Sequence, residues 1–337
     1  MSVALLCGPS RCVEEPAMLQ RLAVGLMNEG VAITSIWPIG CPDTQRSSLV
    51  PRMSIDMPVS WMMRSRRRRL VTEELAALEV DRLVAFGGPA QQLATDVAPT
   101  LGAAVLVEVA SMAAAERCRR SAAVDVWFAS SPSIHRRLAE RIDAQRTAFV
   151  PMGVATGGER VPHGEAGPVS IAVLDGGGDV ATMREVMQGL RSVIAPNDTR
   201  VFMELRGAGQ HRCWRAVRDA GLLDHVSCIA SAAAVRSLIA ECDLVVLPTR
   251  QRGVRTVLLE AMLHGVPVLA PPIPGLDMLI DGETSMVVKD QWAEALGRIL
   301  EDVPLRQRLG EAASHVIASH YSSTAQVESL TRALTGR

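Results

Sequence analysis

The stretch that decides the fold runs from Leu244 to Val288 and reads LVVLPTRQRGVRTVLLEAMLHGVPVLAPPIPGLDMLIDGETSMVV. It opens with a short apolar run at 244–247, as expected of a strand buried on both faces of a parallel sheet. Apolar residues then recur at helical spacing after Thr256, a suitable N-cap, until Gly265 ends the helix. Residues 266–270 form the next apolar run. The stretch therefore predicts a strand–loop–helix–strand unit of an α/β protein.

The loop between that strand and that helix has the residue types of an anion site. It lies at the carboxyl end of a parallel strand, where open α/β sheets bind ligands, and a helix N-terminus favours phosphate. Glu260, about one turn into the helix, could accept two hydrogen bonds from a ribose diol. A surface patch with a solvated glutamate is the alternative. The candidate donor-binding residues of this loop and helix are Arg252, Gly253, Val254, Arg255, Thr256 and Glu260.

The same stretch resembles the group 1 glycosyltransferases of the GT-B fold, glycosyltransferase family 4. Three segments, Pro248–Arg255, Glu260–Ala270 and Pro274–Ser285, follow that family's P-S-x-x-E-G-x-G, E-A-M-A-x-G-x-P-V-V-A and G-G-x-x-E-L-I-x-D-G-x-T-G patterns at fixed spacing. The resemblance implies two Rossmann-like α/β domains with parallel sheets facing across a cleft. It also implies metal-independent, retaining transfer of a sugar from a nucleotide sugar to a saccharide or lipid-linked acceptor, with no cofactor.

The chain departs from the family pattern near the expected site. Ala110 stands where the family has a histidine beside the reaction centre. In the loop 175–179, the backbone of Gly176 and Gly177 could approach the donor closely, but aspartates stand in place of the family's basic pair. Arg252 replaces the first glutamate of the family's E-x7-E pair, so the loop arginines could hold the donor phosphates instead. The rival interpretation is a catalytically degenerate GT-B protein that acts as a binding or regulatory partner.

The N-terminal half predicts a domain of the same class. Residues 2–7 read as a buried strand, followed by a loop with Ser10 and Arg11, a helix from about Glu14 to Asn28 and a second strand at 31–37. Ser10 and Arg11 are acceptor-side candidates because this loop lies at the carboxyl edge of the sheet. No G-x-G-x-x-G follows the first strand, which disfavours an NAD-linked enzyme.

The expected domain organisation combines the composition of the linker with what the family resemblance implies. We expect an N-terminal acceptor-side domain at 1–154, a glycine-rich charged linker at 155–167, a nucleotide-sugar-binding domain at 168–316 and a helix at 317–337 that packs back toward the first domain. Apolar residues beside arginines from Trp61 to Arg69 could make a peripheral contact with an anionic membrane or a lipid-linked acceptor, although a solvated helix start has the same pattern.

Composition excludes several classes. The formal net charge of −1 gives no electrostatic case for nucleic acid. Seven scattered cysteines without a C-x-x-C pair indicate neither zinc nor a disulfide framework, and no metal site is expected. We expect a cytoplasmic protein, or one at the inner face of the membrane. Glu108 is expected to be a carboxylate at the edge of the core without a catalytic role.

Overall fold

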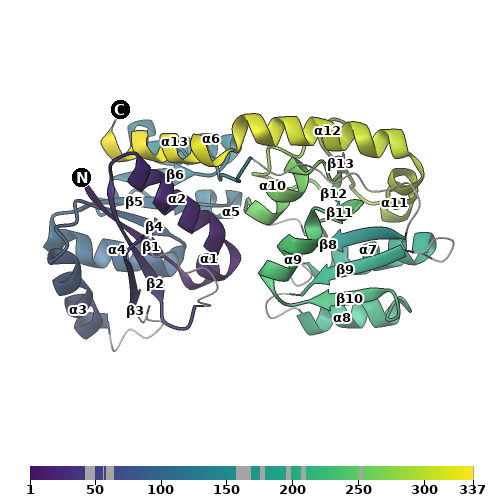
Figure 1. The fold of residues 1–337 in the computed structure, drawn as a ribbon, viewed down its shortest axis with the longest axis horizontal. Helices are drawn as coiled ribbons and strands as arrows, with labels where there is room; N and C mark the ends of the chain where they lie inside the picture. Colours follow the sequence, from purple (N-terminus) through teal and green to yellow (C-terminus); the bar gives the residue numbers. More distant parts are fainter. Residues whose placement is uncertain are drawn as a thin grey trace. The chain divides into compact units, whose positions relative to one another are not determined.

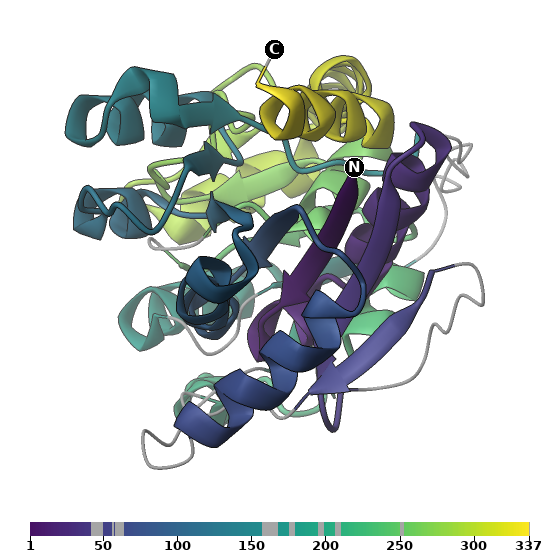
Figure 2. The same cartoon turned by 90° about the vertical axis from the view of Figure 1, so that its left-hand side faces the viewer.

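The computed structural model describes residues 1–41, 50–55, 57, 64–156, 168–174, 179–194, 199–205, 210–249 and 253–336. The chain forms two compact units (Figures 1 and 2). Unit 1 consists of Met1–Val154, Val254–Thr256 and Ser322–Arg337, and unit 2 consists of Ala155–Gly253 and Val257–Tyr321. Each unit holds a parallel sheet flanked by helices, which confirms the predicted α/β class with two Rossmann-like domains. Among the described residues, no helix is long and apolar enough to cross a bilayer.

In the described part of the chain, unit 1 has a seven-stranded sheet in the order β3-β2-β1-β4-β5-β6-β7, with every neighbouring pair parallel. Its strands are β1 (Ser2–Cys7), β2 (Ala32–Pro38), β3 (Arg52–Ile55), β4 (Arg82–Phe86), β5 (Ala104–Val109), β6 (Val126–Ala129) and β7 (Thr147–Phe149). Its helices are α1 (Pro9–Glu14), α2 (Pro16–Asn28), α3 (Arg64–Ala76), α4 (Gly88–Leu101), α5 (Met112–Arg117), α6 (Pro132–Arg141) and α13 (Ser323–Thr335), the last of which packs against α2.

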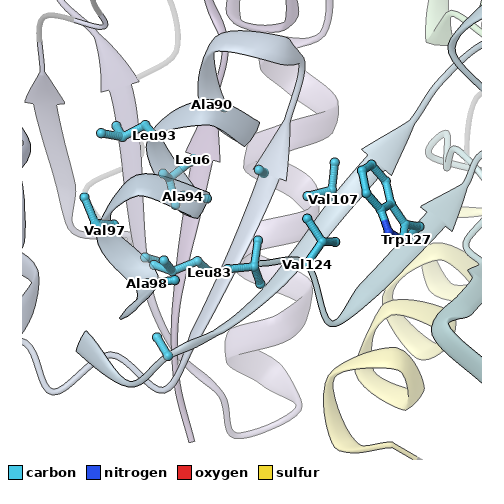
Figure 3. Packing of buried hydrophobic residues seen from close by; sticks show 14 of the residues in the cluster. Leu6, Leu83, Ala90, Leu93, Ala94, Val97, Ala98, Val107, Val124 and Trp127 are labelled. Carbon is cyan, nitrogen blue, oxygen red and sulfur yellow. The ribbon is translucent and has the colours of Figure 1, made fainter. Parts of the chain in front are cut away.

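The core of unit 1 lies between the sheet and the helix α4. Figure 3 shows Leu6, Leu83 and Val107 of three strands next to alanines, a leucine and a valine of α4, with Val124 and Trp127 beyond them. All of these side chains are buried. Such near-continuous burial of the strands is expected for a parallel sheet with both faces covered.

The strand order reverses between β1 and β4, and there the loops after the two strands meet. The Gly8 N–H donates to the Phe86 carbonyl at 2.7 Å. A side chain at Gly8 would place its Cβ 2.9 Å from that oxygen, so the close approach requires glycine. Open α/β sheets bind ligands at such a reversal of strand order.

One loop prediction in unit 1 is wrong. The expected loop at Ser10 and Arg11 is instead the short helix α1, while the helix expected from about Glu14 is α2, separated from α1 by a break at Glu15 (φ −128°, ψ 38°). Pro16 explains the break, because proline disfavours helical geometry in the residue before it and provides no backbone N–H. The α2 helix then begins at Pro16, where a missing N–H costs little.

Unit 2 has a six-stranded sheet in its described residues, in the order β10-β9-β8-β11-β12-β13, again all parallel. Its strands are β8 (Val169–Val173), β9 (Thr199–Glu204), β10 (Val226–Ile229), β11 (Leu244–Val246), β12 (Val268–Ala270) and β13 (Met286–Val287). Its helices are α7 (Val180–Ile194), α8 (Gln210–Asp219), α9 (Ala232–Ile239), α10 (Thr256–Leu263, whose first residue clusters with unit 1), α11 (Trp292–Glu301) and α12 (Val303–His320). The predicted strand–loop–helix–strand unit is confirmed as β11, α10 and β12.

The end of α10 is held by α12. Gly265 follows α10 with a φ of +71°, the left-handed conformation that favours glycine after a helix. Gly310 of α12 lies directly against it, and a Cβ at Gly310 would fall 2.0 Å from the Gly265 carbonyl oxygen. The Ser314 hydroxyl also donates to the Leu263 carbonyl at 2.6 Å. These contacts fix the helix that carries Glu260.

Candidate functional site

Glu260 is paired with an arginine that the sequence patterns did not indicate. The Nη1 group of Arg236, on α9, donates to both carboxylate oxygens of Glu260, at 2.6 and 2.8 Å. The two side chains are 17% and 19% exposed, so the pair is shielded but reachable by solvent. Glu260 is therefore not a solvated helix residue, which was the alternative interpretation. A ribose diol that bound this carboxylate would share it with Arg236.

A signal for Arg236 was present in the sequence. The helix α9 reads AAAVRSLI, and Arg236 is its only charged residue. A lone arginine in a short, otherwise uncharged helix needs a partner when it is partly buried, because an unpaired charge is costly to desolvate. Its partner Glu260 is on a different helix. The sequence therefore indicates that Arg236 needs an acidic partner but does not identify that partner.

Only part of the predicted phosphate loop is described. Arg252 lies outside the described residues, so its role stays a prediction. Gly253 is half-buried, while Val254, Arg255 and Thr256 are buried. Within unit 1, which includes Val254–Thr256, the Thr256 N–H donates to the Glu15 carboxylate at 3.1 Å and the Thr256 hydroxyl donates to the same carboxylate. A carboxylate thus binds a helix-start N–H that was predicted to bind phosphate.

Of the predicted glycine loop at 175–179, the structure describes only the last residue, Asp179. Gly176 and Gly177 lie outside the described residues, and their donor role stays a prediction. Asp179 caps α7: one carboxylate oxygen accepts from the N–H groups of Ala181 and Thr182, at 3.1 Å each, and the other accepts from the Thr182 hydroxyl at 2.8 Å. The aspartate that opposes phosphate by its charge therefore has a structural role, because a carboxylate stabilises a helix N-terminus.

The acceptor-side candidate Arg11 is in a closed ion pair. Its Nε donates to one oxygen of Glu108 at 2.9 Å and its Nη2 to the other at 2.6 Å, and the side chains are only 8% and 4% exposed. Burial raises the pKa of Glu108, while the neighbouring Arg11 lowers it. Burial also lowers the pKa of Arg11, but the charges of Glu108 and Glu15 raise it above its usual value. Arg11 thus stays charged and bound, and a contact of Arg11 or Ser10 with an acceptor remains a prediction.

Two further expectations concern surfaces and metals. Trp61 lies outside the described residues. The arginine run continues into α3, where Arg69 pairs with Glu73 at 3.0 Å and both side chains are exposed to solvent. The predicted membrane contact is not tested by these residues. Among the described residues, no group of three histidine, cysteine or acidic side chains has the geometry to hold a metal ion.

The segment that carries Glu260 and Arg236 matches a known family. Residues 178–302 match the family described as "Glycosyl transferases group 1". This segment of the chain is therefore similar to the group 1 glycosyltransferases. The match begins just before α7 and ends after α11, so it covers most of unit 2.

Curated relatives match over part of their length. Alpha-D-kanosaminyltransferase of Streptomyces kanamyceticus is 37% identical over 101 residues, which is 28% of this chain and 26% of that protein. D-inositol 3-phosphate glycosyltransferase of Paenarthrobacter aurescens is 33% identical over 146 residues, or 40% of this chain and 36% of that protein. The matched segments of this chain thus span little more than a third of those relatives at most.

Solved structures show similarity of fold over nearly the whole chain. A sucrose-phosphate synthase from Thermosynechococcus elongatus has a TM-score of 0.79 at 16% identity, over 99% of both chains. The Anabaena protein HepE, solved in complex with UDP and glucose, has a TM-score of 0.76 at 13% identity, over 98% of this chain and 99% of that one. These likenesses show the GT-B fold, with its two Rossmann-like domains.

Proposed function

We propose that this chain is a glycosyltransferase that moves a hexosyl group from a nucleotide sugar to a saccharide or lipid-linked acceptor, with retention at the anomeric carbon and without a metal ion. The group 1 family match supports the activity, and HepE supports the donor class because it was solved with UDP-glucose. The observation that carries the proposal is the half-buried Glu260 carboxylate in the family-matched segment. Such a carboxylate is shielded enough to distinguish between ligands, and it is exposed enough for a ligand to reach it.

Each residue has a part in the proposed donor complex. Glu260 accepts hydrogen bonds from the two ribose hydroxyls, while Arg236 fixes the direction of the carboxylate. The backbone of Gly253–Thr256 and the charges of Arg252 and Arg255 hold the diphosphate, with Gly176 and Gly177 near it. In the transfer, the bond from the anomeric carbon to the diphosphate oxygen breaks, a bond to the acceptor oxygen forms, and the acceptor hydroxyl loses its proton. We assign no catalytic residue.

Calorimetric titration tests the donor site. The purified chain is titrated with UDP, GDP and ADP, with their glucose conjugates, and with the 2′-deoxy form of the nucleotide that binds. Glu260→Ala should weaken that nucleotide at least tenfold, about 1.4 kcal/mol. It should also abolish the preference for ribose over deoxyribose, because both effects require the carboxylate. Glu311→Ala, at an exposed glutamate on α12, is the matched control and should change neither quantity. Unchanged binding in Glu260→Ala would refute the assignment.

A second candidate is a non-catalytic GT-B protein that acts as a binding or regulatory partner. Two contacts favour it: Arg236 binds Glu260, and Glu15 binds Thr256, so both predicted ligand groups already have protein partners. Ala110, in place of the family histidine, agrees with this alternative. If no nucleotide binds at any salt concentration, this candidate is preferred, and co-purification with an active transferase becomes the next measurement.

A further inference from the structure

A concave surface lined by arginines lies between α7 and α8 in unit 2. Its volume is about 800 Å³. The two helices pack against each other on the sheet, and α8 lies at the β10 edge of unit 2 (Figure 1). The arginine groove, as we name it, is lined by Val180, Ala181, Arg184, Arg212, Arg215, Arg218 and Asp219. Four of these seven side chains are guanidinium groups, and only one is acidic.

Three of the arginines have no ion-pair partner among the residues that the structure describes. Within the described residues, Arg184, Arg212 and Arg215 make no hydrogen bond or ion pair, although all three are exposed at the groove. Arg218 pairs with Asp219 at 2.9 Å, with both side chains about 60% exposed. An exposed pair of this kind contributes about 0–1 kcal/mol, so an incoming anion can displace it easily.

The spacing of these arginines along α8 causes repulsion between like charges when no anion is bound. Arg212, Arg215 and Arg218 follow one another at intervals of three on α8, which places like charges side by side and costs a few tenths of a kcal/mol for each pair. Arg184 on α7 adds a fourth charge from across the groove. An anion with several oxygens relieves this repulsion and accepts charge-assisted hydrogen bonds from several guanidinium groups at once.

The other face of α8 is fixed by the core, so the arginines cannot turn inward. Cys213, Ala216 and Val217 are buried in the core cluster of unit 2. Trp214, on the same helix, is 40% exposed. Exposed indoles together with basic residues on one helix are typical of surfaces that meet phosphate headgroups at a bilayer.

We propose that the arginine groove is a binding site for phosphate-bearing anions, distinct from the donor site proposed at Glu260. The phosphate can belong to a lipid headgroup or to a free molecule, since the guanidinium groups recognise the same oxygens in both. The site binds and does not react. The chain would then bind a second anionic ligand, and the four arginines on two helices would recognise the phosphate oxygens of that ligand.

Two binding measurements separate the sources. In one, inorganic pyrophosphate is titrated into the full chain at low and moderate salt. In the other, the chain is sedimented with vesicles of phosphatidylglycerol and phosphatidylcholine, and with vesicles of phosphatidylcholine alone. Binding of pyrophosphate alone assigns a free phosphate, binding of the anionic vesicles alone assigns a headgroup, and binding of both assigns the phosphate group itself. Binding of neither overturns the proposal.

Charge reversal locates the site. Arg212→Glu/Arg215→Glu should weaken the observed binding at least tenfold, and Arg191→Glu/Arg200→Glu, at exposed arginines outside the groove, should change it less than twofold. If both variants weaken binding equally, general charge is responsible and the proposal fails. Circular dichroism checks folding, and Arg212→Gln/Arg215→Gln replaces the reversal if it does not fold.

The groove and the donor site are tested separately. The groove variant should keep the wild-type affinity for UDP, whereas Glu260→Ala should keep the wild-type affinity for anionic vesicles or pyrophosphate. Loss of both ligands in one variant would show that the two sites are the same and would overturn the claim that the groove is distinct.

Discussion

Two guanidinium–carboxylate pairs, one in each unit, use the same chemistry in different ways. Arg11 presents two nitrogens to the two oxygens of Glu108, and both side chains are less than a tenth exposed. Arg236 presents one nitrogen to both oxygens of Glu260, and both side chains are nearly a fifth exposed. A closed, two-nitrogen pair satisfies both groups within the fold and shields them from solvent. A pair that is partly open to solvent can also exchange its partner for a ligand.

The largest expected effect comes from breaking the closed pair. Arg11→Met leaves the Glu108 carboxylate buried without its cation, so the free energy of unfolding should fall by about 3–5 kcal/mol at pH 8. Urea denaturation measures it. Arg11→Met/Glu108→Leu removes both charges and should recover most of that loss. If the double variant is as unstable as the single one, the loss of stability arises from packing and not from the unpaired charge. The comparison of the two ion pairs would then not hold.

The same variant should be sensitive to pH. Burial raises the pKa of Glu108 and Arg11 opposes that effect, so removal of Arg11 leaves the folded-state pKa further above the unfolded value. A raised folded pKa gives stability below the unfolded pKa that is lost as pH rises through the folded pKa. The deficit of Arg11→Met should therefore shrink by about 1 kcal/mol or more between pH 8 and pH 5. A deficit that is constant across this range would mean that Glu108 does not take up a proton.

Breaking the open pair should affect binding more than folding. Arg236→Met leaves a carboxylate that water can still reach, so the free energy of unfolding should fall by only about 1 kcal/mol. Nucleotide affinity should fall about tenfold, because Glu260 loses the group that directs it. Denaturation and calorimetry on the same preparation provide both values. A loss of stability as large as that of Arg11→Met would show that the two pairs are equivalent.

The smallest effect is expected from a lysine at the open pair. In its described contact with Glu260, Arg236 donates from Nη1, and Arg236→Lys can supply the same charge and a donor there, so stability and nucleotide affinity should change by less than about 0.5 kcal/mol. Arg11→Lys is the contrast, because lysine cannot reproduce a two-nitrogen contact. Equal tolerance of lysine at both positions would remove the distinction that the geometry draws.

The sequence predicted those elements whose determining residues lie close together along the chain. The β11–α10–β12 unit was predictable because its apolar periodicity and its glycine stop lie within thirty residues or so, on the scale of one βαβ unit. The break before α2 had a local cause in Pro16, whereas the residues before it, with Gly8 and Pro9, were predicted to be a loop and form the short helix α1. Position along a strand identified Glu108 as a core-edge residue.

The partners of the candidate residues were beyond reach. Arg11 and Glu108 are 97 positions apart and meet only because β1 and β5 run in the same direction in one sheet. Arg236 and Glu260 lie on two different helices. Such pairs depend on tertiary packing, which no period or motif in the sequence contains. The residue types of the candidate site were therefore predictable, and its hydrogen-bond partners were not.

The contact between Gly310 and Gly265 has a consequence for the freedom of the chain to vary. Every replacement of glycine adds a Cβ, and at Gly310 that atom would lie 2.0 Å from the Gly265 carbonyl oxygen, whatever the rest of the side chain is. A saturation library at codon 310, sorted for folded protein, should return glycine alone. The end of the helix that carries Glu260 therefore restricts a position on a second helix, α12, to a single amino acid.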